Sequence, residues 1–363
     1  MPSLSFLSSS SPRVHLSQVN KVGPQMVPDE MPQRYRPMYR EDEIRLIIDS
    51  ARNGDSLGFV GVAGVGKSNL INFLRDVHHY VPRIDQDVEE LHFPEVNIPE
   101  RGEEASNLWK MMHKALTEAT AELGDPPQES NLVSIFEEER ALDGLRSRLR
   151  WVCQELRHKV MFVLDDADVV FQAGPSEMLE RLNGLRSEGN RDYLSYLVFT
   201  KRRPHVLLRS HSIEDKSKFY DLIKPNLYAL EPYHPKDARQ MLEHLNRDKS
   251  RRLNSRDISQ ILALTGGHAR LMRIVFDTWR REPPTDDDII AYFLSKPDVR
   301  HECERIFSNL HKQEQEVALL VAKGKPTADY KDIIDHLMRR GLLSESLDWF
   351  SPLFAQFLST YKA

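Results

Sequence analysis

The chain has 363 residues, a formal net charge of −5 and an apolar share of 40%. That length is enough for two or three domains with hydrophobic cores. The acidic balance excludes a molecule that attracts nucleic acid through its overall charge. No apolar run is long enough to cross a bilayer, so we expect a cytoplasmic protein without membrane contact. The two cysteines, Cys153 and Cys303, lack metal-site spacing and indicate reduced thiols.

Residues 1–35 are predicted to be a disordered tail. Residues 1–28 contain no Asp or Glu and include four consecutive serines, Ser8 to Ser11. This composition also resembles an organelle transit peptide. Arginine is scarce in the segment and no amphipathic period is visible, which favours the tail over the transit peptide.

Residues 36–225 are predicted to form an α/β domain. Apolar runs predict buried strands at 56–62, 91–98, 160–164 and 194–199, and helical spacing predicts helices at 40–52, 67–80, 107–123 and 132–159. Continuous apolar strands that alternate with helices are typical of a parallel sheet covered by helices on both faces.

After residue 225 the pattern becomes helical. Residues 226–300 are predicted to form a helical lid. Residues 301–363 are predicted to form a winged-helix domain, in which a helix at 313–322 and a helix at 330–340 precede Gly341. Two short strands are then expected within 342–350.

One segment, Gly61-Val62-Ala63-Gly64-Val65-Gly66-Lys67-Ser68, matches the Walker A pattern completely. Its glycines let backbone N–H groups point at phosphates, and the helix that begins near Gly66 adds its positive end. Lys67 is predicted to contact the β- and γ-phosphates, and Ser68 to bind magnesium. Together with Asn69, this segment predicts a site for a nucleoside triphosphate, expected to be ATP with Mg²⁺.

A second acidic motif follows the strand at 160–164. An apolar strand that ends in Asp165 and Asp166 is typical of a Walker B motif, because open α/β sheets bind ligands at the carboxyl ends of their strands. Asp165 is expected to hold magnesium, directly or through water. Asp166 is expected to orient or deprotonate the attacking water, so it joins Lys67 among the predicted catalytic residues.

Two further segments carry polar residues that could reach the phosphates. Thr200 and Arg202 follow the strand at 194–199 and would face the γ-phosphate if that strand neighbours the Walker B strand. We predict a catalytic role for Arg202, with an exposed basic turn as the alternative. Arg270 follows a Gly-Gly turn between two lid helices. It either contacts the nucleotide or lies in a solvated loop, and both interpretations stay open.

The order of these motifs resembles the STAND class of signal-transduction ATPases within the AAA+ group of P-loop enzymes. Arg40, before the first helix, takes a position where that family contacts the base. Thr200-Lys201-Arg202 resembles the family's strand-ending sensor. Gly267-His268-Ala269-Arg270 is similar to the sensor-2 arginine motif of origin-recognition AAA+ proteins. The resemblance implies slow ATP hydrolysis. It does not imply a state locked by ADP, because residues 350–353 lack the histidine that holds ADP in many STAND proteins.

Two functions remain for such a chain. In the first, nucleotide state switches the arrangement of the domains and drives self-association or binding of a protein partner in the ATP state. In the second, the winged helix reads duplex DNA, as in a replication initiator or transposition regulator. Residues 300–363 contain nine Lys and Arg and nine Asp and Glu, which cancel. DNA-reading domains carry a basic excess, so the switch is favoured over DNA binding.

Overall fold

The computed structural model describes residues 39–77, 88, 90–98, 108–126, 137–173, 176–208, 217–247, 252–284, 288–325 and 327–361. These residues belong to one compact unit that spans residues 34–363. The predicted tail and its transit-peptide alternative lie outside the described residues.

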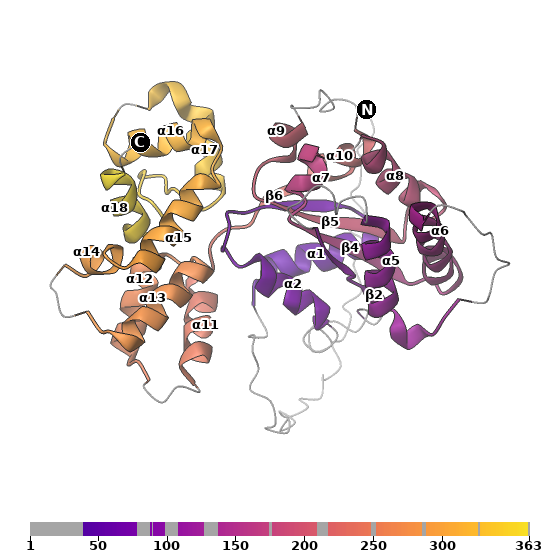
Figure 1. Cartoon of the computed structure of the whole chain (residues 1–363), viewed down its shortest axis with the longest axis horizontal. Helices are drawn as coiled ribbons and strands as arrows, with labels where there is room; N and C mark the ends of the chain where they lie inside the picture. The colour runs from indigo at the N-terminus through magenta and orange to yellow at the C-terminus, as the bar shows by residue number, and fades with distance from the viewer. Residues whose placement is uncertain are drawn as a thin grey trace, which may run out of the picture. The chain divides into compact units, whose positions relative to one another are not determined.

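A parallel sheet forms the centre of the first half of the chain, as the sequence predicts (Figure 1). Its strand order is β2-β4-β5-β1-β6, where β1 is Leu57–Val60, β4 is Lys159–Asp165, β5 is Leu194–Thr200 and β6 is Leu227–Ala229. β5 lies between β1 and β4. The strands that lead into the Walker A loop, into Thr200 and into the Asp pair are therefore neighbours.

The strand predicted at 91–98 is divided in two. β2 (Leu91–His92) and β3 (Glu95–Asn97) both pair with β4, and Phe93 and Pro94 separate them. Proline has no N–H to donate to a neighbouring strand, which explains the break.

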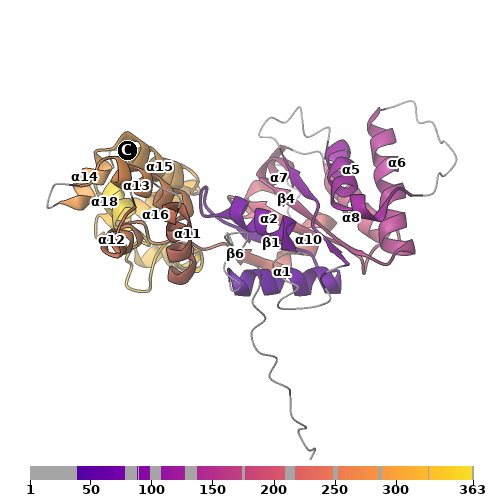
Figure 2. The same ribbon diagram turned by 90° about the horizontal axis from the view of Figure 1, so that it is seen from below.

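Helices cover both faces of the sheet, because side chains of one strand point alternately to opposite faces. Met161 and Val163 of β4 pack in one hydrophobic cluster with α1 (Glu41–Asn53) and α2 (Lys67–Arg75). Phe162 and Leu164 pack in a second cluster with helices from the other face (Figure 2). These helices are α5 (Leu108–Ala119), α6 (Glu137–Leu149), α7 (Asp168–Ala173), α8 (Ser176–Ser187), α9 (Pro204–Leu208) and α10 (Lys218–Ile223).

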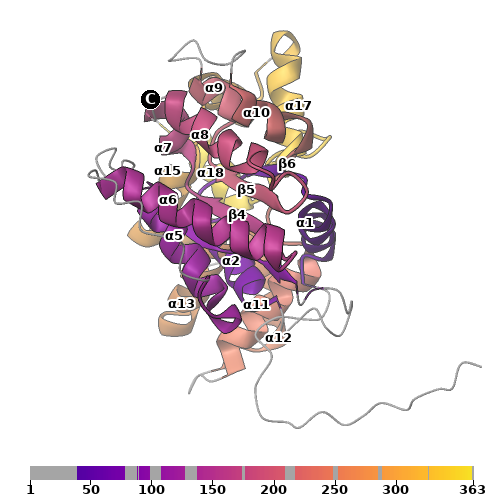
Figure 3. The same cartoon turned by 90° about the vertical axis from the view of Figure 1, so that its right-hand side faces the viewer.

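The helix predicted at 132–159 ends earlier than expected. α6 runs only to Leu149 and continues as a π-helical turn, Arg150–Glu155, before β4 begins. α5 and α6 lie side by side (Figure 3). Two further short turns are 3₁₀ helices at Ala121–Leu123 and Lys224–Asn226.

The second half of the chain is helical. α11 (Pro235–Arg247), α12 (Ser255–Thr265), α13 (Ala269–Arg281), α14 (Ile289–Leu294) and α15 (Pro297–Ser308) follow β6 in chain order. α12 begins with a capping box between Asn254 and Asp257, as an Asn before the first helical turn predicts.

The last helices only partly match the predicted winged helix. α16 (Lys312–Ala322), a 3₁₀ turn (Ala328–Tyr330) and α17 (Lys331–Arg339) are followed by a hairpin and by α18 (Pro352–Thr360). In the hairpin the two expected strands are reduced to one antiparallel bridge, between Leu343 and Trp349. The winged-helix assignment and the predicted domain boundaries therefore stay predictions. None of the described helices is both long and apolar enough to span a membrane.

Candidate nucleotide-binding site

The Walker A segment forms the floor of a cavity of about 540 Å³, within the range of small-molecule sites. β1 ends at Val60, and α2 begins at Lys67, so the loop connects a buried strand to a helix N-terminus as predicted. Val62 and Val65 are buried and anchor the loop in the core. Gly61 is also buried, beneath Leu230. The cavity surface of the segment is formed by Ala63, Gly64, Gly66, Lys67, Ser68 and Asn69.

Two glycines of this loop are required by the backbone. Gly64 has φ of 80° and Gly66 has φ of 117°, both in the region that side chains disfavour. A Cβ on Gly66 would lie 2.9 Å from the Tyr233 hydroxyl. The loop can therefore curl tightly only with glycine at these positions.

Lys67 meets Asp165, the last residue of β4, and the adjacent Asp166 at one end of the cavity. Lys67 Nζ lies 2.7 Å from Asp166 Oδ1 and 3.3 Å from Asp165 Oδ1. Burial lowers the pKa of Lys67, but the two carboxylates outweigh burial and hold it above its ordinary value. Asp166 has φ of 52°, so the chain turns sharply as it leaves β4. The lysine and both aspartates are thus brought together as the two motifs predict.

The end of β5 is arranged differently from the expectation for Arg202. Lys201 lines the cavity and places Nζ 3.3 Å from Asp166 Oδ1. Arg202 lines a neighbouring cavity beside α16 and α17. The cause is Asp168, whose carboxylate accepts the backbone N–H groups of Lys201 (2.8 Å) and Arg202 (3.2 Å) and fixes the turn. Thr200 is 1% exposed, and its carbonyl accepts the N–H of Gly61.

The carboxyl groups around Lys67 differ in their acidity. Burial raises the pKa of Asp165 above its ordinary value. Burial also acts to raise the pKa of Asp166, but Lys67 and then Lys201 outweigh it and hold that pKa below its ordinary value. Asp166 is therefore ionised at neutral pH, which is the state required of a group that accepts a proton or orients water.

The start of α13 docks against the phosphate loop. His268, fully buried, lies with Nε2 3.0 Å from the carbonyl oxygen of Ala63, and its Nδ1 accepts the N–H of Leu271. Burial lowers the pKa of His268 to about 3, so the ring is neutral and Nε2 carries the proton that it donates to Ala63. The N–H of Arg270 donates to the carbonyl of Gly64 over 3.0 Å, and the Arg270 side chain lines the cavity.

Arg40 is held by the protein itself. It is 4% exposed, its guanidinium donates to the carbonyls of Glu231 (2.9 Å) and Val65 (3.4 Å), and it lies 4.6 Å from the centre of the Tyr233 ring. These contacts join the phosphate loop to the segment that leads into α11. The base contact expected of Arg40 stays a prediction.

Four of the polar residues that line the cavity were not selected as site residues from the sequence. These residues are Lys201, Arg273, Arg305 and Asn309. Lys201 could have been found, because it lies within the predicted sensor segment. Arg273, Arg305 and Asn309 lie on α13 and α15 or just beyond, and no local pattern distinguishes them from other polar helix residues.

The charges in the cavity favour a polyanion. Among the described residues that line it, five are cationic and two are acidic. The cations are Lys67, Lys201, Arg270, Arg273 and Arg305, and the acids are Asp165 and Asp166. Lys and Arg are the usual partners of phosphate groups, as point charge and as planar fork respectively.

The oxygen donors in the cavity fit magnesium. The Ser68 hydroxyl and the Asp165 carboxylate both line it. Magnesium in phosphoryl-transfer sites takes one or two protein oxygens and completes its shell with water and substrate phosphates. No cluster of three or more His, Cys, Asp or Glu suited to a metal occurs among the described residues.

Solved structures provide the comparison with known proteins. The chain is similar to a Walker-type ATPase of Pyrococcus abyssi, with a TM-score of 0.55 and 15% identity over 91% of this chain and 99% of that one. It is also similar to the ORC2 protein of Aeropyrum pernix in its ADPNP–ADP complexes, with a TM-score of 0.50 and 16% identity over 92% and 94% of the two chains. No protein-family model matches the chain, and no curated protein matches it. The likeness shows that the chain has the fold of Walker-type, AAA+ P-loop ATPases. The narrower resemblance to the STAND class stays a prediction.

Proposed function

We propose that the chain binds and hydrolyses ATP and that the state of the nucleotide controls the arrangement of helices α11–α18. One observation carries this proposal. The cavity over the Walker A loop is lined by side chains from the loop, from the end of β4, from the end of β5 and from α13 and α15. A triphosphate bound there contacts both halves of the chain, so the loss of its γ-phosphate changes the contacts between them.

The residues of the cavity have different roles in hydrolysis. The backbone N–H groups of the Walker A loop and the N-terminus of α2 cradle the phosphates. Lys67 leaves Asp166 for the β- and γ-phosphates, since the triphosphate carries more negative charge than one carboxylate. Asp166 is then free to orient the attacking water and to accept its proton. Lys201 and Arg270 stabilise the charge that develops on the transferred phosphoryl group.

Magnesium would be held by Ser68 and Asp165. It would neutralise charge on the β- and γ-phosphates, which is its general role in phosphoryl transfer. Ser68 lies at the start of α2 and Asp165 at the end of β4, so the helix and the sheet each provide one of these two donors.

The test of ATP binding is the affinity for ATP with magnesium, measured by calorimetry together with phosphate release. Lys67→Ala is expected to abolish both, because it removes the buried cation that meets the phosphates. Lys114→Ala is the matched control, since Lys114 is a lysine of α5 whose side chain is 77% exposed. The proposal fails if Lys67→Ala binds ATP as tightly as the wild type while both proteins are folded.

The switch is tested separately from catalysis. The association state of the protein is expected to differ between ADP and a slowly hydrolysed ATP analogue, measured by sedimentation. α17 gives no support to DNA reading, because its Asp332 and Asp335 offset Lys331 and Arg339, and the adjacent Arg340 is buried. We therefore expect only non-specific DNA affinity, ~10⁻⁴–10⁻⁶ M at physiological salt. A nucleotide-independent monomer that binds one DNA sequence far more tightly would replace the switch with the DNA-binding function.

A further inference from the structure

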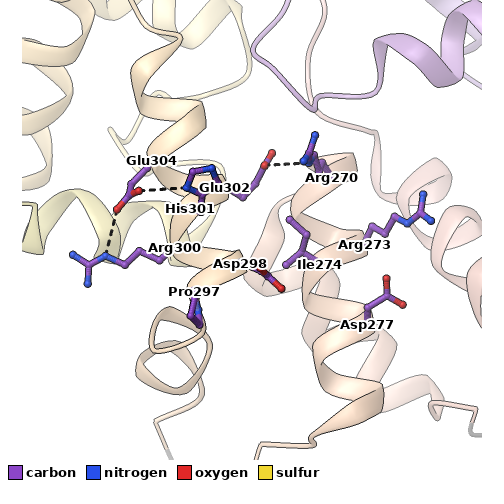
Figure 4. A pocket seen from close by; sticks show the side chains of 10 residues that line it. All are labelled: Arg270, Arg273, Ile274, Asp277, Pro297, Asp298, Arg300, His301, Glu302 and Glu304. Carbon is purple, nitrogen blue, oxygen red and sulfur yellow. Dashed lines mark ion pairs between the residues drawn. The ribbon is translucent and has the colours of Figure 1, made fainter.

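A buried glutamate of α15 lies beside the phosphate loop. The side chain of Glu302 is 2% exposed and pairs with two arginines: Arg270 on α13 (Nε to Oε2, 3.3 Å) and Arg305 on its own helix (Nη2 to Oε1, 2.9 Å). Figure 4 shows Glu302 and Arg270 facing each other between α13 and α15. A Cβ on Gly64 would lie 2.7 Å from Glu302 Oε1 and 2.8 Å from Arg305 Nη2. The charged groups of Glu302 and Arg305 therefore lie against the loop itself.

Arg305 reaches the phosphate-loop cavity from the C-terminal half of the chain. Arg305 and Asn309 both line that cavity, one turn of chain apart. The Nε of Arg305 is buried and has no hydrogen-bond partner among the described residues. A buried donor without a partner is costly, and native structures usually satisfy such groups. The guanidinium also has donors beyond the one engaged by Glu302, which suits it to contact a phosphate while the ion pair remains.

Another ion pair of α15 is exposed, in contrast to Glu302 and its arginines. Arg300 pairs with Glu304 over 3.5 Å, and their side chains are 65% and 45% exposed. Both residues line a cavity between α13 and α15, drawn in Figure 4, which Arg270 and Glu302 also line. Exposed pairs of this kind contribute little to stability or specificity. A pair that only joins helices would need neither the burial of Glu302 nor its position against Gly64.

We propose that Arg305 is a phosphate-binding residue of the nucleotide site and that Glu302 positions Arg305 and Arg270 together for this contact. This inference rests on the proposed function and adds a direct link from the nucleotide to α15. A triphosphate is shared between Arg270 and Arg305, so α13, α15 and the phosphate loop are held together while it is bound. Loss of the γ-phosphate removes part of what holds α15 to the loop.

The contact is tested by the affinities of Arg305→Gln for ATP, ADP and AMP, measured by calorimetry. A hydrogen bond to a charged group contributes enough for a ~10–100-fold loss of ATP affinity. AMP affinity should change much less, because its single phosphate is the α-phosphate, which lies furthest from the position of the γ-phosphate. Arg300→Gln is the matched control and should bind all three nucleotides as the wild type does. Equal ATP affinity in folded Arg305→Gln and wild type would overturn the inference.

A second variant keeps the test valid if Arg305→Gln does not fold. Arg305→Lys retains the charge opposite Glu302 but lacks the planar fork. Its ATP affinity should lie between those of the wild type and Arg305→Gln. If Arg305→Gln is unfolded and Arg305→Lys binds ATP as tightly as the wild type, Arg305 serves only as the ion-pair partner of Glu302.

The positioning role of Glu302 is tested by a double-mutant cycle. Glu302→Ala is expected to lower the ratio of ATP to AMP affinity, and the loss in Glu302→Ala/Arg305→Gln should be smaller than the product of the two separate losses. Additive effects would remove Glu302 from the binding site. The outcomes also separate this inference from the proposed function: if Lys67→Ala loses ATP but Arg305→Gln keeps it, only the inference fails.

Discussion

Two buried glutamates from the C-terminal helices reach the ATPase half of the chain in different ways. Glu302 lies against the phosphate loop, and burial raises its pKa above the ordinary value despite two arginines. Glu314 on α16 lies near the end of β5. Burial acts to raise its pKa too, but His336, Arg340 and the N–H of His311 outweigh burial and lower it to about 2.

The two glutamates differ in whether their arginine partners have hydrogen-bond donors left for a ligand. Arg340 donates to both oxygens of Glu314 (3.1 and 3.2 Å), and its second amino group lies 3.3 Å from the carbonyl of Lys201. Both terminal amino groups of Arg340 thus donate to protein acceptors, whereas its Nε has no partner among the described residues. Arg270 and Arg305 instead turn part of their donors to the cavity that we assign to the nucleotide. We therefore expect the contact of Glu302 to respond to a bound nucleotide and the contact of Glu314 to join the two halves of the chain in either state.

The largest expected effect is a loss of turnover after a substitution in the phosphate-loop cavity. Asp166→Asn removes the carboxylate that would accept a proton from water while keeping the shape of the side chain. Turnover is expected to fall ~10²–10⁴-fold, the range for loss of a general base. ATP affinity should persist, and it should be measured on the same protein by calorimetry. Unchanged turnover would reduce Asp166 to a partner of Lys67.

The second glutamate is expected to govern stability. Glu314→Ala leaves the buried Arg340 without its carboxylate, and breaking a buried ion pair costs about 3–5 kcal/mol. Denaturant unfolding would measure this loss. Glu316→Ala on the same helix is the control, since Glu316 is exposed and surface substitutions change stability by only about 0.5 kcal/mol. If Glu314→Ala is as stable as this control, the contact near β5 does not hold the halves together.

The junction of α13 and the phosphate loop should be sensitive to acid. His268 is neutral in the folded protein, with a pKa lowered to about 3, whereas the unfolded chain binds a proton below its ordinary value of 6.5. Stability is therefore retained above pH 6.5 and lost as pH falls from 6.5 towards 3, by up to ~1.4 kcal/mol per pH unit. The free energy of unfolding should depend less on pH in His268→Gln.

This pH prediction needs a comparison between proteins, because other groups titrate nearby. The pKa of the half-buried His336 is also lowered by burial, and it contributes the same slope to the wild type and to the variant. Only the difference between the two unfolding curves reports on His268. Parallel curves between pH 6 and 5 would show that His268 keeps its ordinary pKa, roughly 6.5.

The smallest expected effect is a difference in turnover between variants of two adjacent residues at the end of β5. Lys201→Ala should lower turnover about tenfold, because its ammonium lies in the phosphate-loop cavity beside Asp166, and a tenfold change equals ~1.4 kcal/mol. Arg202→Ala should lower turnover less, since its side chain lines the cavity next to α17. The reverse order would support the catalytic role predicted for Arg202.

Much of the ATPase half could be predicted from the sequence, because its signals are local. A run such as Val160–Leu164 is apolar at every position, and only a strand buried on both faces needs that pattern. The Walker A loop requires glycine where φ is positive and lysine at the start of a helix, so its conformation can be predicted from its sequence. The predicted strand at 91–98 failed only where Pro94 interrupts it.

The sequence by itself therefore determined the parallel sheet, the phosphate loop and the acidic end of β4. The tertiary structure decided which side chains meet there. Lys201 rather than Arg202 turns to the cavity because Asp168, from the next helix, binds the backbone of both. Arg305 reaches the loop because α15 packs against α13, and α13 contacts a loop that is far away in the chain. Such contacts depend on long-range packing, which leaves no periodic trace in the sequence of either partner.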